Sequence, residues 1–256
     1  MSKTIAFANQ KGGVGKTTTC INLASYLAKS GLKILIVDLD PQGNATTGLG
    51  IIKSQLKQSV YNVLIDELPI KKAIIPTLVE NMDILPSDIN LAGAEVELVY
   101  TKEREKVLKK ALSAVKSSYD YIMIDCPPSL GLLTINALTA SNGTIIPIQS
   151  EYYALEGLSQ LMNNIKLVKR HLNPDLQIEG VLLTMNDSRA TMSKQIAEEI
   201  RKFFGKKLYD TIIPRNVKLA EAPSHGVPIM MHDTRCTGAK AYKALSEEFS
   251  RKQSGN

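Results

Sequence analysis

Short apolar runs alternate with longer amphipathic segments along the chain. Runs with the composition of strands lie at residues 4–9, 33–38, 82–85, 121–125, 144–148, 178–184 and 208–213. Several are apolar throughout, as strands covered on both faces of a sheet are. Apolar residues recur at helical spacing in residues 16–29, 102–117, 155–171, 192–204 and 239–251. This alternation predicts an α/β fold with right-handed βαβ crossovers and a single doubly wound, mostly parallel β-sheet flanked by helices.

Composition places this pattern in one ordinary globular domain. The chain has 256 residues, of which 44% are hydrophobic and 22% charged, and this excludes disordered, collagenous and disulfide-scaffold classes. No linker or repeat interrupts it, so we expect one domain over residues 1–252 and a short polar tail at 253–256. Three distant cysteines without C-x-x-C spacing fit a reducing cytoplasm. The chain shows no signal peptide and no apolar run of membrane-spanning length, so we expect neither secretion nor membrane insertion.

The positive charge is concentrated in the C-terminal part of the chain. The formal net charge is +6, and residues 1–160 hold 15 Lys/Arg and 15 Asp/Glu, whereas residues 161–256 hold 16 and 10. A one-sided basic surface suits a polyanion such as nucleic acid or an anionic membrane. On charge alone, solvated lysines on helix faces are an equally good interpretation.

The strongest local signal is the segment KGGVGKTT between the first predicted strand and the first predicted helix. Its glycines allow successive backbone N–H groups to turn around phosphate oxygens, and the helix N-terminus adds partial positive charge. Lys16 can reach the β- and γ-phosphates, and the Thr17 hydroxyl can ligate Mg²⁺. The predicted nucleotide-binding residues are Lys11, Gly12, Gly13, Val14, Gly15, Lys16, Thr17 and Thr18.

Carboxylates follow two further predicted strands. Asp38 and Asp40 alternate at the end of ILIVDLD, which predicts that both point to one side of the strand end. Asp125 ends YIMID and is followed by Cys-Pro-Pro. Turn or cap chemistry is the alternative for the first pair, because Asp-Pro and Gln-Gly-Asn are good turn formers. Three carboxylates at strand ends beside one phosphate loop favour a nucleotide and metal site.

These motifs resemble those of the ParA/MinD superfamily of P-loop ATPases, whose deviant Walker A motif is K-G-G-x-G-K-[ST]. Residues 147–158 and 213–226 look like the chromosomal ParA subfamily, often called Soj, so the resemblance covers nearly the whole chain. The resemblance implies a P-loop NTPase architecture. It also implies that the protein hydrolyses ATP with Mg²⁺ and that this hydrolysis is slow without the partner protein. Lys16 would act in cis, and Lys11 would reach the ATP of the other subunit in a nucleotide-sandwich dimer. Asp40 would orient the attacking water, Asp38 would lie in the outer shell of the Mg²⁺, and Asp125 would hold a magnesium-bound water.

The resemblance also implies contacts outside the phosphate loop. Pro214 and Asn216 would border the adenine pocket, and Glu151 would contact nucleotide across the dimer. An exposed surface glutamate is the alternative for Glu151. The implied cycle runs from ATP binding through homodimerisation to sequence-independent binding of double-stranded DNA. Hydrolysis stimulated by a ParB-type centromere-binding protein then releases the DNA, so the protein would be cytoplasmic and nucleoid-associated in the ATP state.

The expected DNA contacts lie in the basic part of the chain. Arg189 and Lys218 match DNA-contact positions of the family, and the surrounding charge adds further candidates, namely Lys194, Lys202, Lys206, Lys207 and Arg215. Such residues neutralise phosphates without reading base sequence. For Lys206 and Lys207, a charged helix end is an equally good interpretation. Aromatic residues make up 5% of the chain with no Trp, which disfavours single-strand or RNA platforms.

Two other classes share this scaffold. A MinD-like membrane-recruited ATPase that positions cell division would end in a basic amphipathic helix, whereas residues 239–251 carry Glu247 and Glu248 and an apolar stripe typical of a core-facing helix. We therefore expect no membrane partner. A redox or metabolic relative would need cluster-binding cysteines or a catalytic triad, and the sequence offers neither arrangement. The three histidines also lack metal-ligand spacing.

Overall fold

The architecture is described from a computed structural model over residues 2–151, 154–186 and 191–254, with backbone alone at 154–157 and 191–194. Within these residues, seven strands form one sheet in the order β3-β4-β2-β5-β1-β6-β7. The strands are β1 (Lys3–Phe7), β2 (Ile34–Asp38), β3 (Ile75–Pro76), β4 (Met82–Leu85), β5 (Tyr121–Asp125), β6 (Gly143–Gln149) and β7 (Gln177–Thr184). Among these strands of the described residues, only β3, at one edge, pairs antiparallel with its neighbour. The predicted mostly parallel α/β sheet is confirmed.

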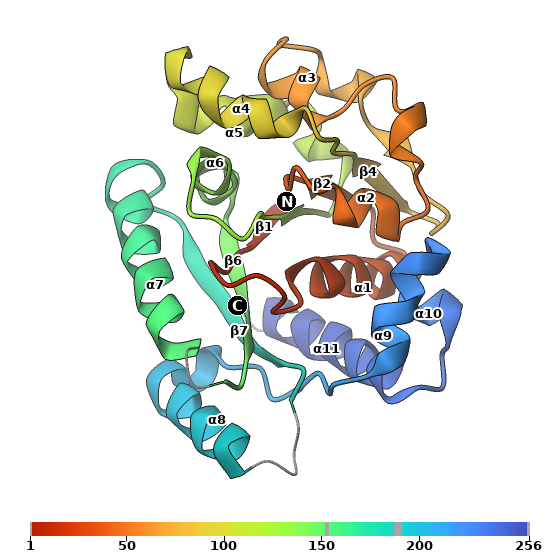
Figure 1. Ribbon diagram of the computed structural model, residues 1–256, viewed down its shortest axis with the longest axis vertical. Helices are drawn as coiled ribbons and strands as arrows, with labels where there is room; N and C mark the ends of the chain where they lie inside the picture. Colours follow the sequence, from red (N-terminus) through yellow and green to blue (C-terminus); the bar gives the residue numbers. More distant parts are fainter. Residues whose placement is uncertain (1, 152–153, 187–190, 255–256) are drawn as a thin grey trace.

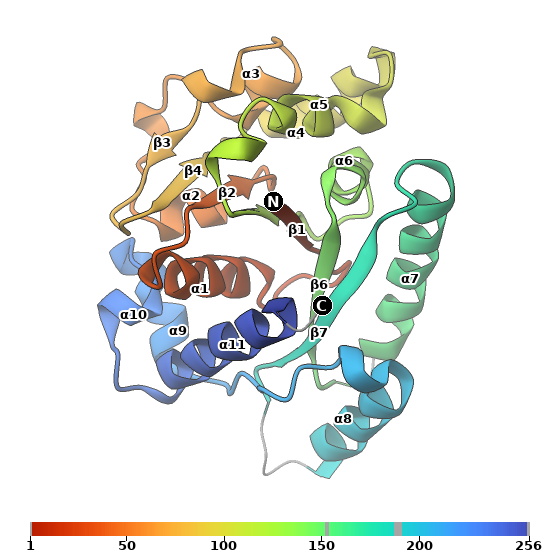
Figure 2. The same ribbon diagram turned by 180° about the vertical axis from the view of Figure 1, so that it is seen from behind.

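Helices cover both faces of the sheet (Figures 1 and 2). They are α1 (Lys16–Lys29), α2 (Asn44–Gly48), α3 (Val60–Leu64), α4 (Leu91–Glu97), α5 (Val107–Ser113), α6 (Leu132–Ala140), α7 (Ala154–His171), α8 (Thr191–Phe204), α9 (Val217–Glu221), α10 (Ile229–His232) and α11 (Thr237–Ser254). Apolar residues of α1, α2, α10 and α11 pack in one core cluster, and those of α3 to α8 pack in the other.

The strand sequences explain this two-sided core. All five residues of β2 are buried. Successive side chains of a strand point to opposite faces, so Ile34 and Ile36 join the cluster under α1 and α11, whereas Leu35 and Val37 join the cluster under α5 and α6. The central strands therefore need apolar residues on both faces, as the uninterrupted runs predicted.

The strand predicted at residues 208–213 is wrong. Within the described residues, this segment makes an isolated parallel bridge at Val181–Leu208, and a second isolated bridge, Asn186–Pro214, follows directly after it. The backbone N–H groups of Asp210 and Thr211 donate to the two carboxylate oxygens of Glu248 on α11, at 2.9 Å each. Because Glu248 binds these donors, the segment runs beside β7 without forming a continuous ladder.

Two further boundaries differ from expectation. The helix predicted at 102–117 is reduced to α5 with a 3₁₀ turn on each side, because the Asn136 side chain accepts from the Leu108 N–H and donates to the Arg104 carbonyl, which places the helix start at Val107. The C-terminal helix continues to Ser254, past the expected start of the tail. Gln253 accepts a hydrogen bond from Lys3 Nζ at 2.6 Å and donates to Glu179, so it is tied to the β1 and β7 ends.

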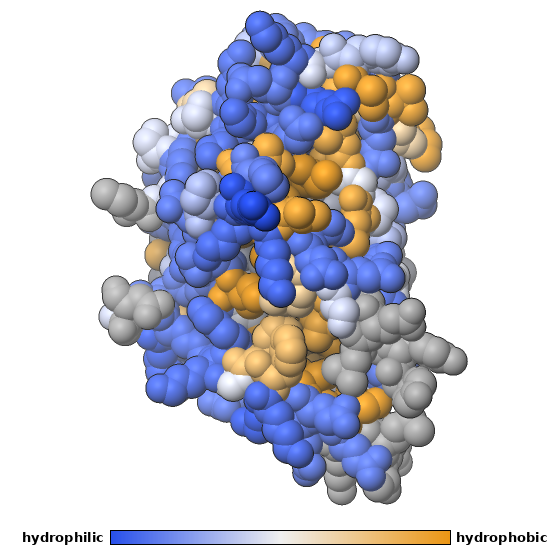
Figure 3. Space-filling view, turned by 90° about the vertical axis from the view of Figure 1, so that its left-hand side faces the viewer, coloured by the Kyte–Doolittle hydropathy of each residue, from blue (hydrophilic) through white to orange (hydrophobic). Residues whose placement is uncertain are grey.

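Figure 3 shows one face of the molecule, on which apolar side chains gather in a few areas. Hydrophilic residues predominate there, and apolar side chains gather near the upper right and the centre of the view. None of the helices among the described residues is long and apolar enough to cross a bilayer.

Candidate functional site

The glycine-rich loop leaves the C-terminal end of β1 and enters α1. Gly13 and Gly15 have φ values of 72° and 84°, in the left-handed region that favours glycine. The Asn9 side chain fixes the start of the loop, since its Oδ1 accepts from the Lys11 N–H at 3.0 Å and its Nδ2 donates to the Pro147 carbonyl at 2.7 Å. Gly15 caps α1 without a side chain, so it offers the N–H groups of the first turn no side-chain acceptor. The loop therefore has the backbone geometry of an anion cradle.

A cavity of about 590 Å³ opens beside this loop. Its wall is made by the loop, the segment after β2, helix α2 and the segment at residues 222–228. Its lining residues are Gly12, Gly13, Gly15, Lys16, Thr17, Thr18, Ile21, Asn22, Asp40, Gln42, Asn44, Thr47, Gly48, Pro128, Met185, Ala222, Pro223, Ser224, Val227 and Pro228. The structure thus brings most of the predicted loop residues together. Val14 is buried and does not line the cavity, and its carbonyl accepts from Thr184 Oγ1 at 2.8 Å.

Lys16 is the first residue of α1 and is only 6% exposed. Its Nζ donates to the Lys11 carbonyl at 3.1 Å, and no carboxylate of the described residues lies within ion-pairing distance of it. Burial lowers the pKa of Lys16, while the charges of Asp125 and Asp40 oppose that shift. A desolvated cation with one carbonyl contact can gain strongly from an incoming phosphate.

The two carboxylates at the ends of β2 and β5 lie side by side, because Asp38 and Asp125 are register partners and both are fully buried. Burial raises the pKa of Asp38 to about 6, although hydrogen bonds from the Thr46 N–H and hydroxyl, both at 2.7 Å, oppose the shift. Burial and then the charge of Asp38 raise the pKa of Asp125 well above its usual range. The nearby Thr17 side chain lowers the pKa of Asp125, yet neither Asp125 oxygen has a partner in hydrogen-bond geometry among the described residues.

A divalent cation fits this arrangement. Buried carboxylate oxygens without partners are costly unless a cation or donor reaches them, and Mg²⁺ prefers oxygen ligands. Thr17 lines the cavity at the start of α1, so its hydroxyl and the Asp125 carboxylate are the groups that could hold or orient such an ion. The described residues contain no cluster of three His, Cys, Asp or Glu side chains that could hold a metal alone, so phosphate and water oxygens would have to complete the shell.

Asp38 and Asp40, which were expected to point to one side of the strand end, have different partners. β2 ends at Asp38, so strand alternation does not extend to Asp40. Asp38 anchors the first turn of α2 through Thr46, whereas Asp40 lines the cavity and its Oδ1 accepts from the Gln42 N–H at 2.9 Å. Asp40 is therefore the carboxylate of this pair that can meet a bound phosphate or its attacking water.

Lys11 and Glu151 form an ion pair within one protomer. Their side chains are 36% and 47% exposed, and they meet because β1 and β6 are neighbouring strands and the two residues lie in the segments that follow them. Neither residue lines the cavity. Their expected action across a dimer would require this pair to separate.

Pro214 and Asn216 do not line the cavity either. Pro214 pairs with Asn186 in an isolated bridge, and the Asn216 side chain caps α9 by accepting from the Lys218 N–H at 2.9 Å. Asn216 also donates to Thr237 Oγ1 at 2.7 Å. The adenine contact expected for these two residues stays a prediction.

Most of the predicted DNA contacts are exposed side chains. Arg189 lies outside the described residues, as does the side chain of Lys194. The others are all exposed, namely Lys202, Lys206, Lys207, Arg215 and Lys218. Lys218 is held in an ion pair with Glu221 at 2.8 Å, a partner that the sequence analysis did not identify although its i,i+3 spacing on a helix was a usable signal.

Sequence reasoning also missed part of the cavity wall. Gln42, Asn44 and Thr47 follow the β2 carboxylates, and their turn-forming sequence was the available signal. The wall at residues 222–228 had no comparable local signal. It reaches the cavity because the Ile229 N–H donates to Asn22 Oδ1 on α1 at 2.8 Å, a contact between residues far apart in the chain.

Comparison with known proteins adds relatives that align over nearly the whole chain. A family model described as an AAA domain matches residues 2–178. The sporulation initiation inhibitor protein Soj of Bacillus subtilis (strain 168) is 60% identical over 97% of this chain and 98% of its own length. The chromosome partitioning protein ParA of Myxococcus xanthus (strain DK1622) is 51% identical over 97% of this chain and 88% of its own. The solved structure of cobyrinic acid a,c-diamide synthase from Mycobacterium smegmatis, with bound ATP analogue and magnesium, superposes with a TM-score of 0.88 at 37% identity, over 100% of this chain and 98% of that one.

Proposed function

The chain belongs to the family of Soj and ParA chromosome-partitioning ATPases, and from that membership we propose that it is an ATP-dependent DNA-partitioning ATPase. The observation that carries the proposal is the convergence of the loop KGGVGKTT with Asp38 and Asp125 at the ends of three adjacent parallel strands, β2, β5 and β1. In open α/β sheets, ligands bind at this carboxyl edge.

In the proposed reaction, the backbone N–H groups of Gly12 to Thr18 bind the triphosphate. Lys16 neutralises phosphate charge from within the protomer, and its low exposure strengthens that interaction. Thr17 and Asp125 would hold or orient Mg²⁺, which supplies charge neutralisation on the phosphates, and Asp38 would support that shell through Asp125 and α2. Asp40, in the cavity wall, orients water for in-line attack.

Dimerisation would complete the site. Lys11 would leave Glu151 and contact the nucleotide of the partner subunit, where it stabilises charge on the transferring phosphoryl group as an arginine finger does. A Cβ at Gly12 would lie 3.8 Å from Pro128 Cβ, which is an ordinary contact, so the space within the protomer does not require glycine at this position. Because Gly12 is exposed, its small size instead supports close approach of a second copy. We propose that the ATP dimer binds double-stranded DNA without sequence preference and associates with the nucleoid. A ParB-type partner would then stimulate hydrolysis and release.

The primary test measures binding to unrelated DNA duplexes with no nucleotide, ADP and ATP across a salt titration. ATP-selective, sequence-indifferent binding that weakens with salt is the expected result. Binding that ignores nucleotide, or no binding, would contradict the proposal. Liposome co-sedimentation with ATP in the same series tests the MinD-like membrane alternative, which the names of the relatives at 51–60% identity support less.

A second test addresses the dimer. Gly12→Val should keep ATP binding in the monomer but abolish ATP-dependent dimerisation in gel filtration, because the added branches project from the exposed loop toward the partner. Gly12→Ala is the matched control and should keep dimerisation, at most weakened, since its Cβ meets only ordinary contact distances within the protomer. Normal dimerisation of the valine variant would refute the sandwich geometry.

A further inference from the structure

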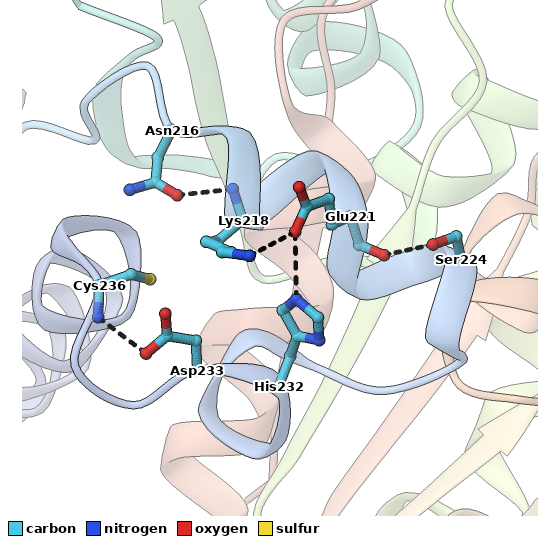
Figure 4. Close-up of polar contacts among 7 residues, drawn as sticks. All are labelled: Asn216, Lys218, Glu221, Ser224, His232, Asp233 and Cys236. Carbon is cyan, nitrogen blue, oxygen red and sulfur yellow. Dashed lines mark hydrogen bonds and ion pairs between the residues drawn. The ribbon is translucent and has the colours of Figure 1, made fainter.

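A cluster of charged and titratable groups surrounds the exposed lysine of α9 (Figure 4). Lys218 Nζ lies 2.8 Å from Glu221 Oε2, one helical turn further along the same helix. His232, at the end of α10, places its Nε2 3.5 Å from the same oxygen. One carboxylate oxygen therefore faces two basic groups that come from two different elements.

The local structure holds these groups in place. Asn216 caps the N-terminal end of α9 by accepting from the Lys218 N–H. At the other end, Ser224 Oγ donates to the Glu221 carbonyl at 2.7 Å. Lys218 and Glu221 are 47% and 41% exposed, whereas His232 is 16% exposed. The pair is thus open to solvent on one side and backed by the imidazole on the other.

Among the described residues, Glu221 is the only carboxylate within ion-pairing distance of Lys218. Asp233 follows α10, and its Oδ1 accepts from the backbone N–H groups of Arg235 and Cys236. The ring of His225 stacks on that of His232 with centroids 4.8 Å apart. The hydrogen bond with Glu221, followed by the charge of that carboxylate, raises the pKa of Lys218, and the hydrogen bond with Lys218 lowers the pKa of Glu221. Both groups are therefore ionised at neutral pH and neutralise each other.

We propose that Glu221 is an intramolecular competitor of DNA phosphate for Lys218, and that His232 tunes this competition by sharing the carboxylate. The proposal rests on the proposed DNA binding through Lys218. A phosphate oxygen and the Glu221 oxygen offer Lys218 the same charge-assisted hydrogen bond. The contact with Lys218 therefore adds to DNA affinity only the amount by which it is stronger than the Lys218–Glu221 pair. The carboxylate also lies 41% exposed on the same surface, where it repels the DNA backbone.

His232 gives the competition a pH dependence with a definite sign. A protonated imidazole pairs with Glu221 and weakens the hold of that carboxylate on Lys218. The groups that face it are Glu221 on α9 and His225 in the turn after α9, while the charges of Asp233 and of Cys236 before α11 act on Lys218. Lower pH therefore adds positive charge to this surface and releases Lys218, and both effects strengthen DNA binding.

The test compares Glu221→Gln with Glu103→Gln in the full-length protein with ATP. Glu103 is the matched control, because it also pairs with a lysine three residues away, Lys106, at 2.7 Å, and lies beside α5 in another part of the molecule. Glu221→Gln should bind DNA roughly two- to fivefold more tightly than wild type, with a steeper salt dependence, and Glu103→Gln should bind as wild type does. ATP affinity and thermal melting measured in parallel check that the cavity and the fold are intact.

A double-mutant cycle separates release of Lys218 from a simple change of net charge. In the Lys218→Ala background, Glu221→Gln should keep only the smaller gain that comes from removing a carboxylate that repels DNA, because no lysine remains to be released. An equal gain in both backgrounds, or no gain in either, would overturn the proposal while leaving DNA binding itself established. Absence of ATP-dependent DNA binding in every variant would instead defeat the proposed function together with this inference.

The histidine part has its own readout. Wild type should bind DNA more tightly at pH 6 than at pH 8, and this ratio should shrink in His232→Gln. An equal pH 6 to pH 8 ratio in His232→Gln and in wild type would show that the carboxylate is not shared, and would remove the histidine from the proposal.

Discussion

Two lysines that we assign to phosphate groups sit in opposite environments. Lys16 is 6% exposed at the start of α1, and its Nζ contacts a backbone carbonyl. The Lys218 side chain is 47% exposed on α9, and its Nζ contacts a carboxylate. Burial lowers the pKa of Lys16, whereas the pair with Glu221 raises the pKa of Lys218. The same side chain is thus prepared for the same ligand chemistry in two ways.

The difference teaches where single residues matter. In a desolvated cavity a Coulomb interaction is several times stronger than in water, and an unpaired cation there gains most when its anion arrives. On an exposed face the interaction is screened by salt and shared among many residues. We therefore expect nucleotide binding to depend strongly on one lysine, and DNA binding to depend on the summed contributions of many exposed basic residues.

The largest effect is expected at Lys16. Lys16→Ala should weaken Mg-ATP binding by about 100-fold or more, because the variant cannot make the charge-assisted hydrogen bond to phosphate inside the cavity. Lys16→Arg should also bind poorly, since the larger guanidinium does not fit where Nζ lies 3.1 Å from the Lys11 carbonyl. Titration calorimetry measures both. Lys29→Ala, at the other end of the same helix, is the control and should bind normally. Near-normal affinity of either Lys16 variant would remove the contrast between the two lysines.

Asp40 comes next, with an effect on rate and not on binding. Asp40→Ala should bind ATP, dimerise and stay on DNA, while hydrolysis falls by roughly 100-fold or more because the attacking water loses its orienting carboxylate. Asp88→Ala is the matched control. The Asp88 side chain makes the same turn contact, accepting from the N–H two residues later at 2.9 Å, but does not line the cavity. Gel filtration showing Asp40→Ala as a monomer with ATP would mean that the role assigned to Asp40 is wrong.

Asp125 extends the comparison of buried and exposed charges to the pH dependence of protein stability. Its raised pKa means that the folded protein holds this proton more tightly than the unfolded chain does, so stability falls as pH rises from about 3.8 to the raised folded-state pKa. Asp125→Asn removes the buried negative charge. Without ligand it should melt about 3 °C higher than wild type at pH 8, and at pH 4 the two should melt alike. Its Mg-ATP binding should be weaker.

Asp38→Asn is the control for that gain. The Asp38 carboxylate is equally buried but accepts two hydrogen bonds from Thr46, so neutralising it also weakens the anchor of α2. Differential scanning calorimetry should therefore show no stabilisation in Asp38→Asn. If both variants gained equally, burial alone would govern the two sites, and the lack of hydrogen-bond partners at Asp125 would not be the cause.

Local patterns predicted the centre of the fold and the phosphate loop. Strands β4 and β5 begin and end where predicted, because most of their residues are apolar and buried, although β4 carries a half-buried Asp83. The loop was equally predictable, since Gly13 and Gly15 occupy positions where other residues are strained. Both signals lie in contiguous residues.

What the sequence could not predict depends on contacts between distant segments. The run at 208–213 has the composition of a strand, but Glu248 in the last helix binds its N–H groups. The pairing of Lys11 with Glu151 follows from the adjacency of β1 and β6, and the wall at residues 222–228 depends on Asn22. The shared carboxylate of Glu221 likewise needed α10 to be placed beside α9. Periodicity carries no information on which segments will meet.

The smallest effect is expected at Lys218. Lys218→Ala should weaken ATP-dependent DNA binding only a few fold at low salt, and the slope of log affinity against log salt should become shallower by about 0.9 for each phosphate that is no longer neutralised. Lys218→Arg should bind as well as wild type, in contrast to the arginine variant at Lys16, because an exposed side chain can adjust its reach. Lys106→Ala, which breaks a comparable lysine–glutamate pair elsewhere, should leave DNA binding unchanged. If instead Lys218→Ala abolished binding and Lys218→Arg could not restore it, this lysine would be desolvated in the complex, and the DNA surface would have to close around the phosphate as the cavity does.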